Sequence, residues 1–243
     1  MRITAKSDIG KVRSTNQDSY LAGEKSDGAA WAVVCDGMGG AAGGNVASST
    51  AVRMISHAID ECYRSGMKSS SVYNMFESAV AGANAYVYDM GQKDDNLNGM
   101  GTTCVAALVV DNNVYVAHVG DSRAYIVSSD GALRQLTRDH SMVQDLVENG
   151  TISEDEAKSF PGKNIITRAI GVEKRIAVDF IEETFSDGDI LILCTDGLTN
   201  FVSNEEIVAA TTDATCFEYA EKLVDLANEN GGGDNVTVVS IAH

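Results

Sequence analysis

Apolar residues in this chain gather in short runs that are rich in Val and Ile and that end at Gly, Asn or Asp. Runs of this kind predict buried β-strands. The predicted strands cover 30–36, 103–111, 114–120, 123–127, 176–183, 189–196 and 235–242. Tight turns are predicted at 111–113 (Asp-Asn-Asn) and 130–131 (Asp-Gly), because these residues tolerate positive φ.

Between the strands, apolar residues recur at steps of three to five, the spacing of one helix face. One such face runs from Val46 to Cys62, a less regular one covers 71–90, and a third covers 217–227 before the glycines at 231–233. Consecutive antiparallel strands flanked by helices predict a layered α+β fold. The 243 residues hold one proline and no linker-like or repeated segment, so we expect a single domain over 1–243.

The composition of the chain indicates which classes of binding partner it disfavours, and in which compartment the protein works. With 35 acidic and 18 basic side chains the net charge is −17, and such a surface repels nucleic-acid backbones and anionic lipid. The N-terminus carries no apolar signal segment, and no window approaches 18 apolar residues. The five cysteines form no CxxC pair, and three lie inside apolar runs, as expected in a reducing compartment. We expect a cytoplasmic protein that binds neither nucleic acid nor membrane.

Four aspartates stand at the tips of strand-like runs: Asp36, Asp121, Asp196 and Asp234. Any one of them could be an ordinary turn or cap residue. An ionised carboxylate at the end of a buried strand is costly unless a positive charge balances it, so four together indicate a shared cation site. Oxygen ligands without His or Cys favour Mg²⁺ or Mn²⁺ over Zn²⁺. Gly37 would let its own carbonyl approach such an ion, although a tight turn also explains it.

Two other motifs suggest different ligands. The "GMGGAA" stretch at 37–42 fits a dinucleotide-binding pattern, but the acidic candidate Asp60 lies in a helical pattern instead of at the end of the next strand. The "DDNLNG" stretch at 94–99 fits half of a calcium loop, but its twelfth position is Val105. We interpret both as structural segments.

Nucleophilic side-chain catalysis has little support, because the chain has no G-x-S-x-G elbow and its four histidines have no metal-ligand spacing. Arg13, in "RSTNQD", is one of the few basic residues near the acidic motifs. A lone Arg is more often a surface residue, but its planar fork could hold two oxygens of a phosphoryl group.

Taken in order, these motifs resemble the metal-dependent protein Ser/Thr phosphatases, the PPM or type 2C family, in their bacterial form. The matching segments are "RSTNQD", "VCDGMGG", "GTT", "HVGDSR", "LTRDHS", "TRAIG", "CTDGL" and "GGGDNVTVV". Each is weak alone, but together they span nearly the whole chain. Residues 142–168 also resemble the flap of bacterial members, a segment beside the active site.

The resemblance implies a four-layer αββα sandwich with two central antiparallel sheets. It also implies roles for particular residues. Asp36 would bridge two Mn²⁺ or Mg²⁺ ions, with the carbonyl of Gly37 completing one shell. Asp196 and Asp234 would hold the other ion, and Asp121 with Asp196 a weaker third. Asp18 would orient waters, and Arg13 would bind the substrate phosphate.

The implied reaction is hydrolysis of phosphoserine and phosphothreonine by direct attack of a metal-bridging water, without a phosphoenzyme. Two positions depart from the family pattern. Met38 stands where eukaryotic relatives carry a His assigned as general acid, and a thioether cannot donate a proton. His118 replaces the commoner Asn before "VGDSR", and packing is a sufficient interpretation of it.

The expected partners are phosphorylated proteins and, by resemblance, a eukaryotic-type Ser/Thr kinase that the enzyme would oppose, with a monomer as the default. The alternative from a different class is a non-catalytic phosphoprotein-binding regulator, a pseudophosphatase. Ligand loss would favour it, but Arg13, Asp36, Asp196 and Asp234 are all present. A stress-response phosphatase would have the same chemistry but usually carries an added sensory domain.

Overall fold

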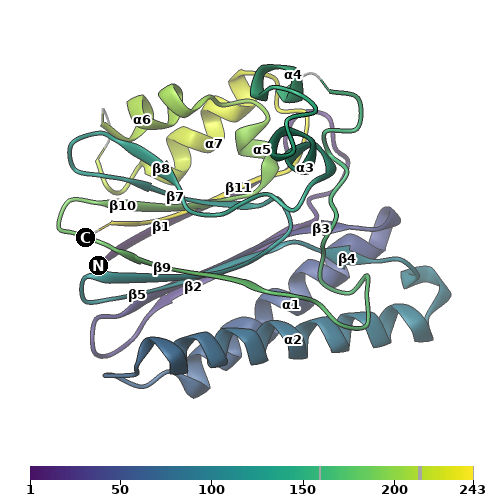
Figure 1. Ribbon diagram of the computed structural model, residues 1–243, viewed down its shortest axis with the longest axis horizontal. Helices are drawn as coiled ribbons and strands as arrows, with labels where there is room; N and C mark the ends of the chain where they lie inside the picture. The colour runs from purple at the N-terminus through teal and green to yellow at the C-terminus, as the bar shows by residue number, and fades with distance from the viewer. Residues whose placement is uncertain (159, 213–214, 243) are drawn as a thin grey trace.

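Two antiparallel sheets form the centre of the computed structural model, which describes residues 1–158, 160–212 and 215–242 (Figure 1). The strands are β1 (Arg2–Asp8), β2 (Asp18–Glu24), β3 (Ala30–Met38), β4 (Gly101–Thr102), β5 (Cys104–Val110), β6 (Asn113–Val119), β7 (Arg123–Val127), β8 (Leu133–Gln135), β9 (Asp179–Thr184), β10 (Ile190–Cys194) and β11 (Val236–Ala242). The helices are α1 (Gly40–Cys62), α2 (Ser69–Lys93), α3 (Met142–Glu148), α4 (Glu154–Lys158), α5 (Asp196–Thr199), α6 (Asn204–Thr212) and α7 (Tyr219–Glu229), with a 3-10 turn η1 (Asp95–Leu97).

One sheet has the strand order β1-β11-β10-β7-β8, and the other has β2-β3-β5-β6-β9, with β4 paired to the end of β3. In Figure 1, α1 and α2 cover the outer face of the second sheet, and α6 and α7 cover the outer face of the first. The predicted αββα sandwich is therefore confirmed.

Strand β3 shows why its sequence is apolar without alternation. Trp31, Val33 and Cys35 pack toward α1 and α2, whereas Ala32 and Val34 face the other sheet. A strand covered on both faces buries every side chain, so its sequence has no polar stripe. A third apolar cluster lies between the first sheet and α7.

All seven predicted strands are present within a few residues. The prediction at 103–111 corresponds to β5, with the short strand β4 just before it, and the strand predicted at 176–183 begins late, at Asp179. Both predicted turns are found, with φ of 49° at Asp111 and 84° at Gly131. Strands β1, β2 and β8 and helices α3 to α6 were not predicted. Among the described residues, no helix is long and apolar enough to cross a bilayer.

Candidate metal centre and active site

The strand register brings the four aspartate tips to one end of the sandwich. Asp36 lies near the end of β3, and Asp196 directly follows Thr195 at the end of β10. Asp121 lies in the turn from β6 to β7, and Asp234 stands two residues before β11. Because the strands are antiparallel, the end of one lies beside the start of the next: Cys194 pairs with both Val238 and Arg123. Carboxylates from both sheets therefore lie close enough to raise the pKa of Asp36 together. The elements that carry them are labelled in Figure 1.

Asp18 connects the two sheets beneath this group. It begins β2 opposite Asp36 and is buried. Its Oδ2 accepts hydrogen bonds from the hydroxyls of Thr195, at 2.9 Å, and Thr237, at 2.7 Å, both on the other sheet. Its Oδ1 is buried without a hydrogen-bond partner among the described residues. A buried carboxylate oxygen without a donor is unusual, and its acceptor capacity fits a cation or a cation-bound water.

Burial and mutual repulsion disfavour the charged form of these carboxylates. Burial raises the pKa of Asp36 well above its usual value, and neighbouring carboxylates raise it further: those of Asp18, Asp196, Asp121 and Asp234. Burial also raises the pKa of Asp18 and the pKa of Asp121, each to about 7. Burial and the charge of Asp234 raise the pKa of Asp196. One ion pair, between Arg13 and Asp234, does not balance five gathered carboxylates, so these residues fit one or more hard divalent cations.

These shifts predict a pH dependence for the metal-free protein. A carboxyl whose pKa is higher in the folded state stabilises the fold at low pH and loses that contribution as pH rises through the folded value. Two buried histidines oppose this at low pH, because burial lowers the pKa of His118, to about 3, and that of His140. Above about pH 6.5, the unperturbed pKa of histidine, most unfolded histidine is neutral and its opposing contribution fades, so the carboxylates dominate.

We therefore expect the unfolding midpoint of the EDTA-treated protein to fall between about pH 6.5 and pH 8.5, by the equivalent of about 1 kcal/mol or more. Saturating Mn²⁺ should remove this slope, because a cation favours the ionised carboxylates. Differential scanning fluorimetry across this range checks both statements. A metal-free midpoint that rises with pH would contradict the assigned cause.

Arg13 lies on the exposed loop before β2 and approaches the cluster from outside. Its Nη2 donates to Oδ2 of Asp234 at 2.7 Å. Asn235 holds this loop: its Nδ2 donates to the carbonyls of Ile9 and Thr15, and its Oδ1 accepts from the backbone N–H of Gln17. The sequence predicted Arg13 but not the supporting amide of Asn235.

Backbone packing at Gly37 is tight. Its N–H donates to the carbonyl of Gln17 at 3.2 Å, and a Cβ at this position would lie 2.1 Å from the carbonyl oxygen of Gly44 in α1. The close approach of helix to strand therefore requires glycine. Met38 follows on the same face of β3 as Asp36, because side chains two apart in a strand share a face.

A cavity of about 1140 Å³ opens beside the carboxylates. Asp121 and Asp196 border one side, and the segment 142–168 borders another through residues of α3, of α4 and of the following loop. A bridge between Ser141 and Ile166 closes the base of this segment. Lys163 reaches Oδ1 of Asn200 at 3.1 Å, and Nδ2 of Asn200 donates to Oδ2 of Asp196 at 2.9 Å. The segment therefore contacts, through one intervening amide, the cluster of Asp18, Asp36, Asp121, Asp196 and Asp234, hereafter the carboxylate group.

The structure thus gathers Asp18, Asp36, Asp121, Asp196 and Asp234, with Arg13 bonded at the edge. His118 lies elsewhere, fully buried in β6 with its ring against that of His140. Four contributors were not predicted, namely Thr195, Thr237, Asn200 and Asn235. The sequence signal for the last was its place directly after Asp234.

Comparison with known proteins gives a consistent result. A family model described as "Protein phosphatase 2C" matches residues 10–230. The chain is 38% identical over 242 residues to the serine/threonine phosphatase stp of Listeria innocua, covering 99% of this chain and 95% of that protein.

Two solved structures superpose over nearly the full length. The S. agalactiae serine/threonine phosphatase gives a TM-score of 0.92 at 37% identity, covering 100% of this chain and 99% of that one. The catalytic domain of the serine threonine protein phosphatase PstP, solved in complex with two manganese ions, gives 0.85 at 36% identity, covering 98% and 96%. The chain belongs to the protein phosphatase 2C family.

Proposed function

We propose that this metal-dependent protein serine/threonine phosphatase hydrolyses phosphoserine and phosphothreonine by direct attack of water on phosphorus, at the carboxylate group between the two sheets. The observation that carries this mechanism is the convergence of Asp36, Asp196 and Asp234 on one site with excess negative charge. The proposed chemistry does not use a side-chain nucleophile. A non-catalytic regulator would be expected to lack some of these metal ligands, and here all three aspartates are present.

We assign the cation ligands from this arrangement. Asp36 and the Gly37 carbonyl would share two Mn²⁺ or Mg²⁺ ions with Asp196 and Asp234, and Asp121 with Asp196 would hold a weaker third. When bound, such ions supply an activated water near neutral pH and balance the charge of the phosphate. A relative whose structure contains two manganese ions supports this proposal, without fixing the metal used by this chain.

Asp18 would keep water oriented beneath the ions. The hydroxyls of Thr195 and Thr237 fix Oδ2, so Oδ1 is held in one direction with its lone pairs free. An acceptor held in this way can accept a hydrogen bond from the attacking water and so orient it. In the absence of a cation, burial raises the pKa of Asp18 to about 7.

Arg13 would bind the phosphate. In this structure its Nη2 contacts Asp234, which leaves the other guanidinium donors available for phosphoryl oxygens. Its side chain is 55% exposed, so an incoming phosphoprotein can reach it. Met38 cannot protonate the departing alkoxide, and that proton would have to come from water in the site.

The function is tested by phosphate release from phosphothreonine, phosphoserine and phosphotyrosine peptides, with Mn²⁺, Mg²⁺ or EDTA. We expect metal-dependent turnover of the first two peptides. Arg13→Ala should raise KM about 10- to 100-fold, the loss of one charged hydrogen-bond pair, and Arg13→Lys should restore it only in part. A folded, metal-loaded wild type without turnover would support the pseudophosphatase instead.

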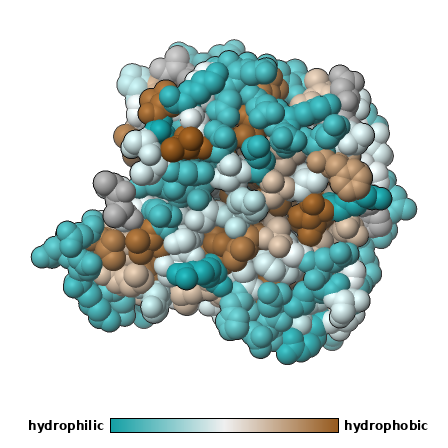
Figure 2. Space-filling model, turned by 180° about the vertical axis from the view of Figure 1, so that it is seen from behind, coloured by the Kyte–Doolittle hydropathy of each residue, from teal (hydrophilic) through white to brown (hydrophobic). Residues whose placement is uncertain are grey.

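In the cell, we propose phosphorylated proteins as substrates and a eukaryotic-type Ser/Thr kinase as the opposing enzyme. The net charge of −17 disfavours both nucleic acid and anionic lipid as partners. We propose that the protein acts in the cytoplasm. A monomer fits the surface: apolar residues on the face shown in Figure 2 form small groups separated by polar ones. Pull-down with a substrate-trapping variant, followed by phosphoproteomics, would identify the substrates.

A further inference from the structure

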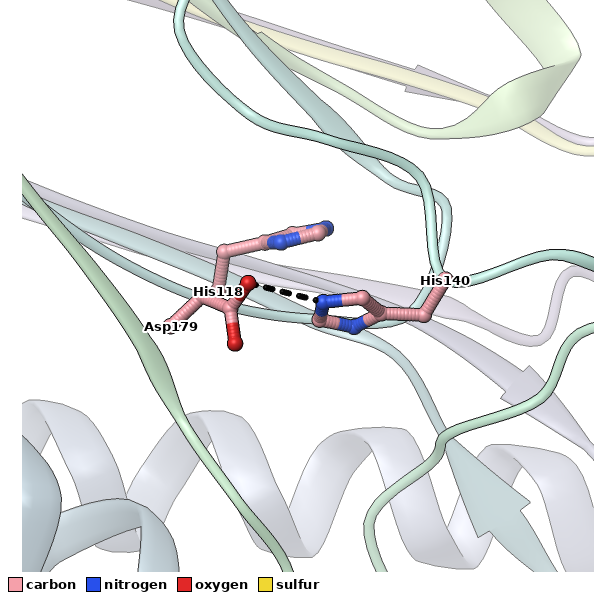
Figure 3. A group of neighbouring side chains, drawn as sticks. All are labelled: His118, His140 and Asp179. Atoms are coloured by element: carbon pink, nitrogen blue, oxygen red, sulfur yellow. Dashed lines mark hydrogen bonds and ion pairs between the residues drawn. The ribbon is translucent and has the colours of Figure 1, made fainter. Parts of the chain in front are cut away.

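Three residues outside the proposed cation site, His118, His140 and Asp179, lie together (Figure 3). His118 is in β6, opposite Asp179 at the start of β9, and His140 lies on the connection between β8 and α3. The two imidazole centroids are 4.5 Å apart, and both rings are buried. Both ring nitrogens of His118 lack a hydrogen-bond partner among the described residues.

A metal ion is the first possibility for this trio, since one ligand atom from each lies within 4.8 Å of the others. The hydrogen bonds of His140 argue against it. Its Nδ1 accepts the backbone N–H of Gly120 at 3.0 Å, so in the neutral ring Nε2 carries the proton and faces Oδ2 of Asp179 at 3.2 Å. A metal on Nε2 would have to displace that proton, and Arg168 already occupies Oδ1 of Asp179.

The same hydrogen bonds give His140 another task. Besides receiving the Gly120 N–H, it donates its own backbone N–H to the Gly120 carbonyl at 2.8 Å. Both polar groups of Gly120 are therefore held by one residue. The neighbouring Asp139 binds the other side of the turn. Its carboxylate accepts hydrogen bonds from Nε of Arg123, at 2.8 and 3.0 Å, and from Nη2 of Arg123, at 2.7 Å. Asp121 lies in the sequence between Gly120 and Arg123, the two residues that these hydrogen bonds hold.

The turn has little room to relax. Gly120 has a φ of 108°, and a Cβ there would lie 2.7 Å from Thr103. The hydroxyl of Thr103 in turn accepts the N–H of Asp36 at 2.9 Å and contacts the Ser122 hydroxyl at 2.6 Å. Gly120 therefore precedes Asp121 directly and packs against the residue whose hydroxyl binds the N–H of Asp36.

We propose that His140 is a positioning residue: through Nδ1 it fixes the Gly120–Asp121 turn, and Asp179, itself held by Arg168, fixes the orientation of the ring. The outer partner sets the tautomer, as it does for many histidines that act through one nitrogen. The carbonyl of His140 also accepts the N–H of Thr167, which links the turn to the end of the 142–168 segment. The inference rests on the proposed role of Asp121 as ligand of the weaker ion.

Two substitutions separate the two ring nitrogens. His140→Asn keeps an acceptor near the position of Nδ1, whereas His140→Gln keeps a polar group near Nε2 and loses the contact to Gly120. We expect His140→Gln to lower the Mn²⁺ affinity of the weakest proposed site about 10-fold or more, the usual effect of losing a residue that supports a metal ligand. The affinity of the tighter sites should not change. His140→Asn should stay within about threefold of the wild type.

The test is Mn²⁺ titration by isothermal calorimetry of both variants, the wild type, Asp121→Asn and His118→Phe. If only packing mattered, the smaller Asn would lower the Mn²⁺ affinity more than Gln would. A lower affinity in His140→Asn than in His140→Gln, or equal affinities in both variants, would therefore overturn the proposal. An ion lost in His118→Phe would assign a metal to the trio and overturn it as well. Asp121→Asn should lose the weaker ion. If it keeps every ion, the proposed role of Asp121 fails, whatever His140 does.

Discussion

Asp36→Asn is expected to abolish phosphate release, by about 10³-fold or more, while stabilising the metal-free protein. The loss of rate follows if Asp36 is the carboxylate shared by both ions, because neither ion then keeps its position relative to the phosphate. The gain in stability follows from the structure alone. Asp36 lies among Asp18, Asp121, Asp196 and Asp234, and burial and these charges disfavour its ionised form.

An amide has nearly the shape of the carboxyl and carries no charge, so it relieves this repulsion. We expect the free energy of unfolding in EDTA to rise by about 1 kcal/mol or more, the equivalent of one pKa unit. The order should reverse with Mn²⁺, because the wild type gains binding free energy that the variant cannot. Loss of activity and gain of metal-free stability in one substitution is the signature of a ligand, since a structural residue would lose both.

The measurements are phosphopeptide turnover and urea unfolding, each with Mn²⁺ and with EDTA. Asp89→Asn provides the matched control, an exposed aspartate on α2 remote from the carboxylate group. It should leave turnover and the response to Mn²⁺ unchanged. Near-normal turnover in Asp36→Asn would remove this residue from the reaction, and a less stable metal-free variant would show that its carboxylate has a compensating partner.

Apart from β9, a partly exposed edge strand, the strands that could be predicted from sequence are those covered on both faces. β3, β5, β6, β10 and β11 are nearly continuous apolar runs because a layer packs on each side. β1 and β2 are polar-rich edge strands, and nothing local specifies them. β1 exists because it pairs with β11, with Arg2 opposite Ala242, and a pairing over that sequence distance has no local signal.

The same distinction holds at the site. Aspartates at strand tips are visible in a sequence because a carboxylate after an apolar run is unusual. Thr195 and Thr237 are not, since threonine is common in strands. Their meaning arises only from the register that places Thr237 beside the end of β10 and turns both hydroxyls toward Asp18. The residues that orient a carboxylate are therefore harder to predict than the carboxylate.

Gly37→Ala is expected to destabilise the fold by about 3 kcal/mol or more, since a new methyl group would overlap fixed backbone. The Cβ would lie 2.1 Å from the carbonyl oxygen of Gly44 and 2.6 Å from that of Gln17. Neither atom can swing aside, because Gly44 is inside α1 and the Gln17 carbonyl receives the N–H of Gly37. The start of the helix would have to move away from β3.

The conditions of the measurement separate two reasons for a glycine here. If the contact with Gly44 is the cause, urea unfolding will show the full loss in EDTA, where no ion is bound. If the carbonyl mattered only as a ligand, the metal-free variant would resemble the wild type and differ only when Mn²⁺ is added. Gly82→Ala is the matched control, because Gly82 is exposed in the middle of α2 with nothing within 4 Å of the new methyl group. There the same change should stabilise the protein by about 0.5–1 kcal/mol, the difference in helix propensity, so the two substitutions should shift the unfolding midpoint in opposite directions.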